Sequence, residues 1–211
     1  LTKLKLSQFS GISLKKYTTL IMVSGSYNQL GKGEVKKIKK WVEEGNTLIT
    51  IARGSSWAIS KKLINESLVE SKKDSTHSRK NYVDAREFIG RERIGGVILK
   101  ADLDLTHPIA FGYNDNSIPV YKNNNVFINK TKNDYSSVAT YSKDFHIDGY
   151  ISESNKKDFI PSAASLIISK VGSGRVVVFA DNPNFRGTWY GTNKLFLNAI
   201  FLGNNISVPT N

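Results

Sequence analysis

The sequence of 211 residues contains no cysteine. This absence excludes disulfides, thiolate nucleophiles and cysteine-based metal sites. A membrane-spanning helix requires an apolar run of about eighteen residues. The sequence has no such run, so a membrane-spanning helix is excluded. The first residues, Leu-Thr-Lys-Leu-Lys-Leu, do not have the pattern of a signal peptide, and we expect the chain to be a fragment of a longer protein.

Histidine is scarce as well. The three histidines, His77, His107 and His146, are far apart and have no metal-ligand spacing, so the sequence predicts no metal site in this chain. His107 precedes Pro108, and a residue before proline is biased away from helix, which indicates the end of a strand.

Basic residues outnumber acidic ones, 30 to 18, for a formal charge of +12. Such a balance favours anionic partners, although it also serves solubility. The lysines are spread along the chain in pairs and are not gathered in one block. Neither zinc-finger spacing nor an aromatic-basic RNA-binding motif accompanies them, so we do not expect a nucleic-acid partner.

Apolar runs predict buried strands at residues 20–23, 47–51 and 176–180. Between the first two, residues 33–45 carry apolar side chains at helical spacing, and a second helix is predicted at 57–68. Strands that alternate with helices over short connections predict a doubly wound α/β fold with right-handed crossovers.

The remaining segments predict a single domain over residues 1–211 with an antiparallel extension. A short edge strand is expected at 4–9 and an exposed loop at 70–93. The other expected elements are a strand at 97–102, a β-rich insertion or extension at 114–160, a β-hairpin of 164–171 with 175–180, and a helix at 192–202.

Three loops are expected at the carboxyl edge of the parallel strands, where α/β folds bind ligands. Arg53 or Arg186 would hold an anion there. Alternatively, Arg186 has a structural role and pairs with Asp181 or caps carbonyl groups. The predicted ligand-binding residues are Ser24, Gly25, Ser26, Arg53, Asp181, Asn182 and Arg186.

The turn at Ser55 and Ser56 loosely matches the nucleophile elbow of serine hydrolases. The strict motif needs a glycine where Ala58 stands, and His107 or His146 would have to serve as the base. The simpler interpretation is that both serines cap the helix that follows. They remain weak catalytic candidates.

The C-terminal third carries a family resemblance. The run Asn182-Pro-Asn-Phe-Arg-Gly187, with its flanks at 174–181 and 189–200, resembles the C-terminal domain of large bacterial zinc carboxypeptidase-like proteins. That domain is similar to class I glutamine amidotransferases. Shorter matching pieces lie at 17–27, 45–49, 56–59 and 105–113.

The resemblance implies a flavodoxin-like three-layer sandwich with a mostly parallel sheet and an antiparallel extension, preceded in the family by a strand and a helix before Leu4. It also implies a cysteine nucleophile near residues 53–55, where this chain has none. No His-x-x-Glu occurs either, so the resemblance places zinc in a peptidase domain outside this chain, which itself is expected to need no cofactor.

From these observations we expect a catalytically silent accessory domain of a periplasmic or extracellular zinc carboxypeptidase-like protein. Its partners would be the upstream peptidase domain, a peptide substrate or an anionic cell-envelope ligand. Two alternatives stay open: a serine hydrolase using Ser55 or Ser56, and a sugar- or nucleotide-binding module that uses the loops at the sheet edge.

Overall fold

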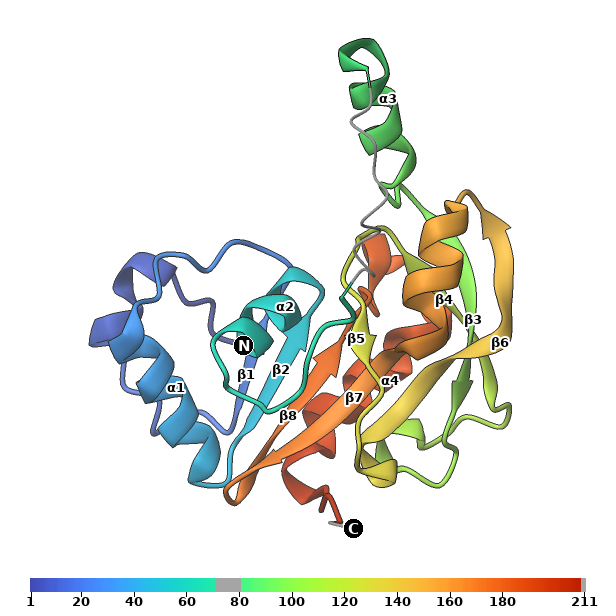
Figure 1. The fold of residues 1–211 in the computed structure, drawn as a ribbon. Coiled ribbons are helices and arrows are strands. Elements are labelled where there is room, and N and C mark those ends of the chain that lie inside the picture. Colours follow the sequence, from blue (N-terminus) through green and yellow to red (C-terminus); the bar gives the residue numbers. More distant parts are fainter. Residues whose placement is uncertain (71–80, 210–211) are drawn as a thin grey trace.

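The computed structural model describes residues 1–70 and 81–209. Its centre is one eight-stranded sheet in the order β1-β2-β8-β7-β6-β3-β4, with β5 paired to β7 (Figure 1). The strands are β1 (Thr19–Met22), β2 (Thr47–Ile51), β3 (Val97–Leu103), β4 (Ser117–Lys122), β5 (Ile128–Asn129), β6 (Ser137–Gly149), β7 (Ala163–Val171) and β8 (Gly174–Phe179).

The α-helices are α1 (Lys32–Glu43), α2 (Arg53–Ser60), α3 (Tyr82–Arg91) and α4 (Tyr190–Phe201). Short helical turns fill several connections, among them η1 (Leu6–Gly11) and the π-helical η4 (Asn155–Phe159). Figure 1 shows α3 standing away from the rest of the molecule.

The sheet is mixed. The neighbours β1, β2 and β8 run parallel, whereas β8-β7, β7-β6, β6-β3 and β3-β4 are antiparallel pairs. The expectation of a mostly parallel sheet therefore holds only for the part formed by β1, β2 and β8. The strands expected within 114–160 belong to the same sheet and extend it.

Two cores cover the two faces of the sheet, as three layers require. In β2, Leu48 faces the core under α1 and α2 with Trp41 and Trp57. Its neighbour Ile49 faces the other core, which includes Leu195 of α4. Because both faces are covered, β2 and β8 are buried at every position, which explains why both sequences are mainly apolar.

Three local predictions were wrong. No strand forms at residues 4–9: residues 6–9 belong to the turn η1, in which Phe9 is the buried residue. The second helix begins at Arg53 and ends at Ser60, before Lys62 takes a left-handed φ of 54°. Residues 82–91, expected to be loop, form α3, whereas residues 71–80 lie outside the described part.

Among the described residues, no helix combines the length and the apolar character that crossing a bilayer would require.

Candidate functional site

The parallel strands bring the three predicted loops to one edge of the sheet. Residues 24–26 follow β1, Arg53 follows β2, and residues 181–186 follow β8. Because β1, β2 and β8 are adjacent and parallel, their carboxyl ends lie side by side. The prediction that these loops share an edge is confirmed.

The turn after β2 has the strained geometry of a nucleophile elbow. Ala52 joins β2 to α2 with φ 49° and ψ −112°, a conformation that costs a residue with a Cβ about 1–3 kcal/mol. In hydrolases this sharp strand-to-helix turn carries the nucleophile. Here it carries a methyl group, and that methyl group is buried. The turn therefore keeps the backbone strain without a reactive side chain.

Gly54 allows this turn to approach β1 closely. A Cβ at Gly54 would lie 2.6 Å from the carbonyl oxygen of Met22 and 3.0 Å from that of Val23, so any larger residue would push the two loops apart. The resemblance placed the missing nucleophile near residues 53–55, and the elbow comparison pointed to Ser56. In this structure the residue with the strained backbone at the turn is Ala52.

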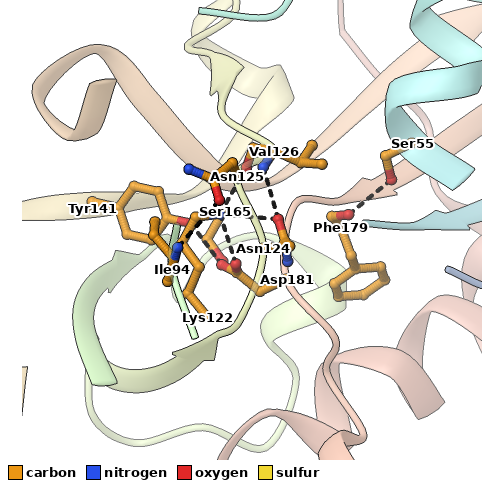
Figure 2. Close-up of polar contacts among 10 residues, drawn as sticks. All are labelled: Ser55, Ile94, Lys122, Asn124, Asn125, Val126, Tyr141, Ser165, Phe179 and Asp181. Carbon is orange, nitrogen blue, oxygen red and sulfur yellow. Dashed lines mark hydrogen bonds and ion pairs between the residues drawn. The ribbon is translucent and has the colours of Figure 1, made fainter. Parts of the chain in front are cut away.

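The side chain of Ser55 lies on the side of α2 that packs against the sheet. It is fully buried, and its hydroxyl lies 2.9 Å from Thr50 Oγ1. Figure 2 shows its second contact, with the carbonyl oxygen of Phe179 at 2.8 Å. A serine in this position ties α2 to β2 and β8. Ser56 is half-buried within α2, and its backbone N–H donates to the Ala52 carbonyl oxygen. The N-cap residue of α2 is Ala52, so the expectation that the two serines cap this helix was wrong.

His107 lies at the opposite edge of the sheet from Ser55. It follows β3, and β3 runs opposite to β8 because three antiparallel pairings separate the two strands. Its Nδ1 accepts a hydrogen bond from the Ile109 N–H at 3.1 Å, and burial lowers its pKa, opposed by the charge of Asp104. His107 is thus not placed to act as a base for Ser55 or Ser56.

Asp181, predicted to contact a ligand, is buried in an internal polar cluster (Figure 2). Its Oδ1 lies 3.0 Å from Lys122 Nζ. Its Oδ2 accepts hydrogen bonds from Tyr141 at 2.6 Å and Ser165 at 2.9 Å. With both oxygens engaged, the carboxylate of Asp181 contributes to the fold. The expected alternative partner, Arg186, is replaced by Lys122.

Lys122 is a fully buried lysine. Besides Asp181, its ammonium group donates to the carbonyl oxygen of Val126 at 2.7 Å and lies 4.5 Å from the centroid of the Phe127 ring. Burial lowers the pKa of Lys122, and the charge of Asp181 acts in the opposite direction. Burial also raises the pKa of Tyr141 well above its ordinary value, and the neighbouring Asp181 raises it further. A charge pair of this kind is costly to break from one side.

The pair also shapes the sheet. Lys122 ends β4, and in the sheet order β7, β6 and β3 stand between β4 and β8. Direct contact between Lys122 and Asp181 therefore requires the antiparallel part to curve until β4 returns towards the end of β8. The cavity that Asp181 lines there has a volume of about 10 Å³, which holds about one water. Side chains therefore fill most of the space beside Asp181 at the carboxyl end of β8.

The other predicted residues remain at the surface of this edge. Ser24, Ser26, Arg53 and Arg186 are exposed, and Gly25 and Asn182 are half-buried. Arg186 takes a left-handed φ of 52° and its guanidinium carbon lies 5.4 Å from the Phe185 ring centroid. Their role in ligand binding stays a prediction.

Sequence reasoning missed Lys122 and Tyr141, although a signal for Lys122 exists. Ile118, Val120 and Lys122 alternate along β4 and all three are buried. A lysine in the inward register of a strand predicts a buried counter-charge. For Tyr141 no such signal distinguishes the cluster from ordinary core packing.

No group of three histidine or acidic side chains that would suit a metal ion is found in residues 1–70 and 81–209. His146, in β6, contacts the carbonyl oxygen of Gly149 through Nε2 at 2.7 Å. His77 lies outside the described residues.

No protein-family model matches the chain. No curated protein matches it either.

Solved structures do match. A putative GMP synthase subunit from Thermoplasma acidophilum aligns with a TM-score of 0.55 at 15% identity, over 95% of this chain and 79% of that chain. PurLQS from Thermotoga maritima aligns with a TM-score of 0.53 at 17% identity, over 90% and 81%. A putative ThuA-like protein from Parabacteroides merdae aligns with a TM-score of 0.54 at 12% identity, over 96% and 76%.

These likenesses show the fold. The chain is an α/β protein with a mixed sheet and flanking helices, and its architecture fits the flavodoxin-like, glutamine amidotransferase-like fold. At this level of identity, function has to be argued from the residues of the chain itself.

Proposed function

We propose that this chain is a non-catalytic accessory domain with a ligand-binding role, built on the glutamine amidotransferase-like fold. The observation that carries the proposal is Ala52, which occupies the strained turn after β2 with φ 49°. A side chain without a nucleophilic atom at this turn leaves the fold's usual covalent chemistry without its first step.

Two further observations support the absence of catalysis. The hydroxyl of Ser55, the nearest alternative nucleophile, is buried and hydrogen-bonded to Thr50 and Phe179. His107 lies beyond the other edge of the sheet, as the strand directions require. General-base activation needs both groups within hydrogen-bond reach of each other.

A finer form of the proposal makes the chain an accessory domain of a secreted zinc carboxypeptidase-like protein. The resemblance of the run at 182–187 supports it. In this form the domain packs on the peptidase, or binds its substrate or a cell-envelope ligand, in the periplasm or outside the cell. Zinc then belongs to the peptidase domain.

The catalytic half of the proposal is tested by a glutamine hydrolysis assay and by labelling with a fluorophosphonate probe. We expect neither turnover nor labelling. Labelling that disappears in Ser55→Ala or Ser56→Ala would instead establish a serine hydrolase and end the proposal.

The accessory half is tested by pulldown with the peptidase domain of the parent protein and with purified cell-wall fragments. Retention on either one is the expected result. Failure to bind both would remove the accessory role while leaving the absence of catalysis intact.

A further inference from the structure

Three large cavities lie away from the elbow. One, of about 820 Å³, lies between the segment at 65–67, the loop after β5 and the start of β7. A second, of about 400 Å³, shares Asn65, Glu66 and Asn133 with it and continues to α1 and the end of β7. A third, of about 380 Å³, shares Lys170 and Gly172 with the second. Because consecutive cavities share lining residues, they are neighbours along one side of the molecule, and we call the row of three a trough.

This trough is strongly basic. Its lining includes five lysines and two glutamates, and we call it the lysine groove: Lys39, Lys62, Lys130, Lys132 and Lys170, with Glu43 and Glu66. One of the two carboxylates, Glu66, accepts a hydrogen bond from Ser169 at 2.9 Å. An excess of one charge in a hollow focuses the field and concentrates ligands of the opposite charge.

The walls of the groove are held in place by internal hydrogen bonds. Asn129 donates to Ser67 Oγ at 2.9 Å and to the Leu68 carbonyl oxygen at 3.0 Å. Asn133 donates to the Pro209 carbonyl oxygen at 2.6 Å and accepts from the Tyr135 N–H at 3.0 Å. A groove whose loops are already fixed loses little entropy when a ligand binds.

The chemistry of the lining distinguishes between classes of polyanion. Residues with amide or hydroxyl groups line the cavities together with the lysines, among them Asn65, Ser67, Ser162, Ser173, Asn204 and Ser207. The residues that line the three cavities include no aromatic side chain. Single-stranded nucleic acids are usually held by aromatic stacking, whereas amides, hydroxyls and ammonium groups match sugar hydroxyls and acidic substituents.

We infer that the lysine groove binds an anionic polysaccharide, with the lysines on its acidic groups and the amides on its hydroxyls. The inference rests on the proposed binding role and names its site and ligand class. Three neighbouring cavities in a row suit an extended polymer, because successive units of the chain can each contact a different cavity.

Calorimetric titration of the full chain with an oligogalacturonate and with a heparin oligosaccharide tests the inference and distinguishes carboxylated from sulfated ligands. A neutral dextran oligosaccharide and a short DNA serve as comparison ligands. We expect at least one anionic glycan to bind, with an affinity that falls as salt rises, and we expect weaker binding of dextran and DNA. No binding of either anionic glycan, or DNA binding that is equally tight and competes with the glycan, would overturn the inference.

Two matched double variants distinguish binding by the lysine groove from attraction by the overall charge of the protein. Lys130→Glu with Lys170→Glu should weaken glycan binding by about tenfold or more, because two attractive contacts become repulsive. Lys15→Glu with Lys143→Glu makes the same change in net charge at exposed positions outside the three linings, and its affinity should stay within about twofold. Equal loss in both pairs would overturn the inference, provided that thermal unfolding shows all variants folded.

Asn65→Ala tests the hydrogen-bonding part. Asn65 is exposed and lines both of the larger cavities. We expect weaker glycan binding with an unchanged salt dependence, because no charge is removed. Unchanged affinity would contradict recognition by the amides. Failure of these binding tests would not affect the assays of catalysis, so the two proposals fail separately.

Discussion

The carboxyl edge of the parallel strands and the lysine groove are both rich in polar side chains, yet they differ in what those side chains contact. At the edge, Ser55 and Asp181 are buried and bonded within the chain, and the adjoining cavity measures about 10 Å³. In the groove, Asn65 and Lys130 are exposed beside a cavity of about 820 Å³. Ser55 and Asp181 thus stabilise the fold, whereas Ser24, Ser26, Arg53 and Arg186 stay exposed at the same edge. Gly25 and Ser26 also line a mainly apolar cavity of about 290 Å³ there. The open hollow with several charged side chains lies elsewhere.

The largest effect that tests the contrast between the sheet edge and the lysine groove is expected at Asp181. Replacing it with asparagine leaves the fully buried ammonium group of Lys122 without a counter-charge. We expect Asp181→Asn to lower the free energy of unfolding by about 3–5 kcal/mol, measured by denaturant unfolding.

The matched control is the double variant Asp181→Asn with Lys122→Met. It removes both charges and leaves an amide oxygen for Tyr141 and Ser165. We expect it to be more stable than Asp181→Asn alone, because no charge stays unpaired in the core. A fully stable Asp181→Asn protein would show that this end of β8 is open to solvent and would remove the contrast with the groove.

A smaller effect is expected at Ser55. Ser55→Ala removes the hydrogen bonds to Thr50 and Phe179 inside the core, and should cost about 1–3 kcal/mol of unfolding free energy. The neighbouring Ser56 is half-buried, so Ser56→Ala should change the unfolding free energy by no more than about 0.5 kcal/mol. Equal costs at the two positions would contradict the structural role assigned to Ser55.

The smallest expected effect concerns the pH dependence of the free energy of unfolding. Burial raises the pKa of Tyr27 to about 12, and its hydroxyl donates to the Val23 carbonyl oxygen beside the loop at 24–26. The folded state keeps this proton where the unfolded chain, with a tyrosine pKa of about 10, has lost it. The contribution of the Tyr27 hydroxyl to the free energy of unfolding is therefore complete below about pH 10 and is lost as the pH rises towards 12.

Guanidinium unfolding at several alkaline pH values measures this loss. Tyr27→Phe should reduce the fall in stability above about pH 10, whereas Tyr82→Phe, at a residue that is 92% exposed, should leave it unchanged. An identical alkaline profile in wild type and Tyr27→Phe would contradict the burial of this hydroxyl.

Sequence was a good guide where one physical cause dominates the local structure. The run at 176–180 is apolar throughout and the run at 47–51 is mainly apolar because both faces of the sheet are covered, and these runs predicted β2 and β8. The hairpin of β7 and β8 followed from the glycines at its turn. The helix α1 followed from its apolar face, with Ile38 and Val42 buried.

The failures share a different cause, namely dependence on distant contacts. Strand direction in the extension depends on pairings such as β3 with β6 that no local pattern specifies. The left-handed φ of Ala52 is imposed by its surroundings, since alanine has no preference for it. The partner of Lys122 stands 59 positions further along the chain. For the site, the sequence therefore correctly predicted that the three loops share one edge. It also predicted that Asp181 contacts a ligand, whereas the structure buries Asp181 against Lys122.

We propose that the ligand contacts the lysine groove and not the elbow. Amide chemical-shift mapping of the full chain during titration with the glycan that binds in calorimetry tests this directly. We expect the largest shifts at Asn65, Lys130 and Lys170, with little change at Ala52, Asn182 and Arg186. Shifts concentrated at Ala52, Asn182 and Arg186, with the groove unchanged, would contradict it.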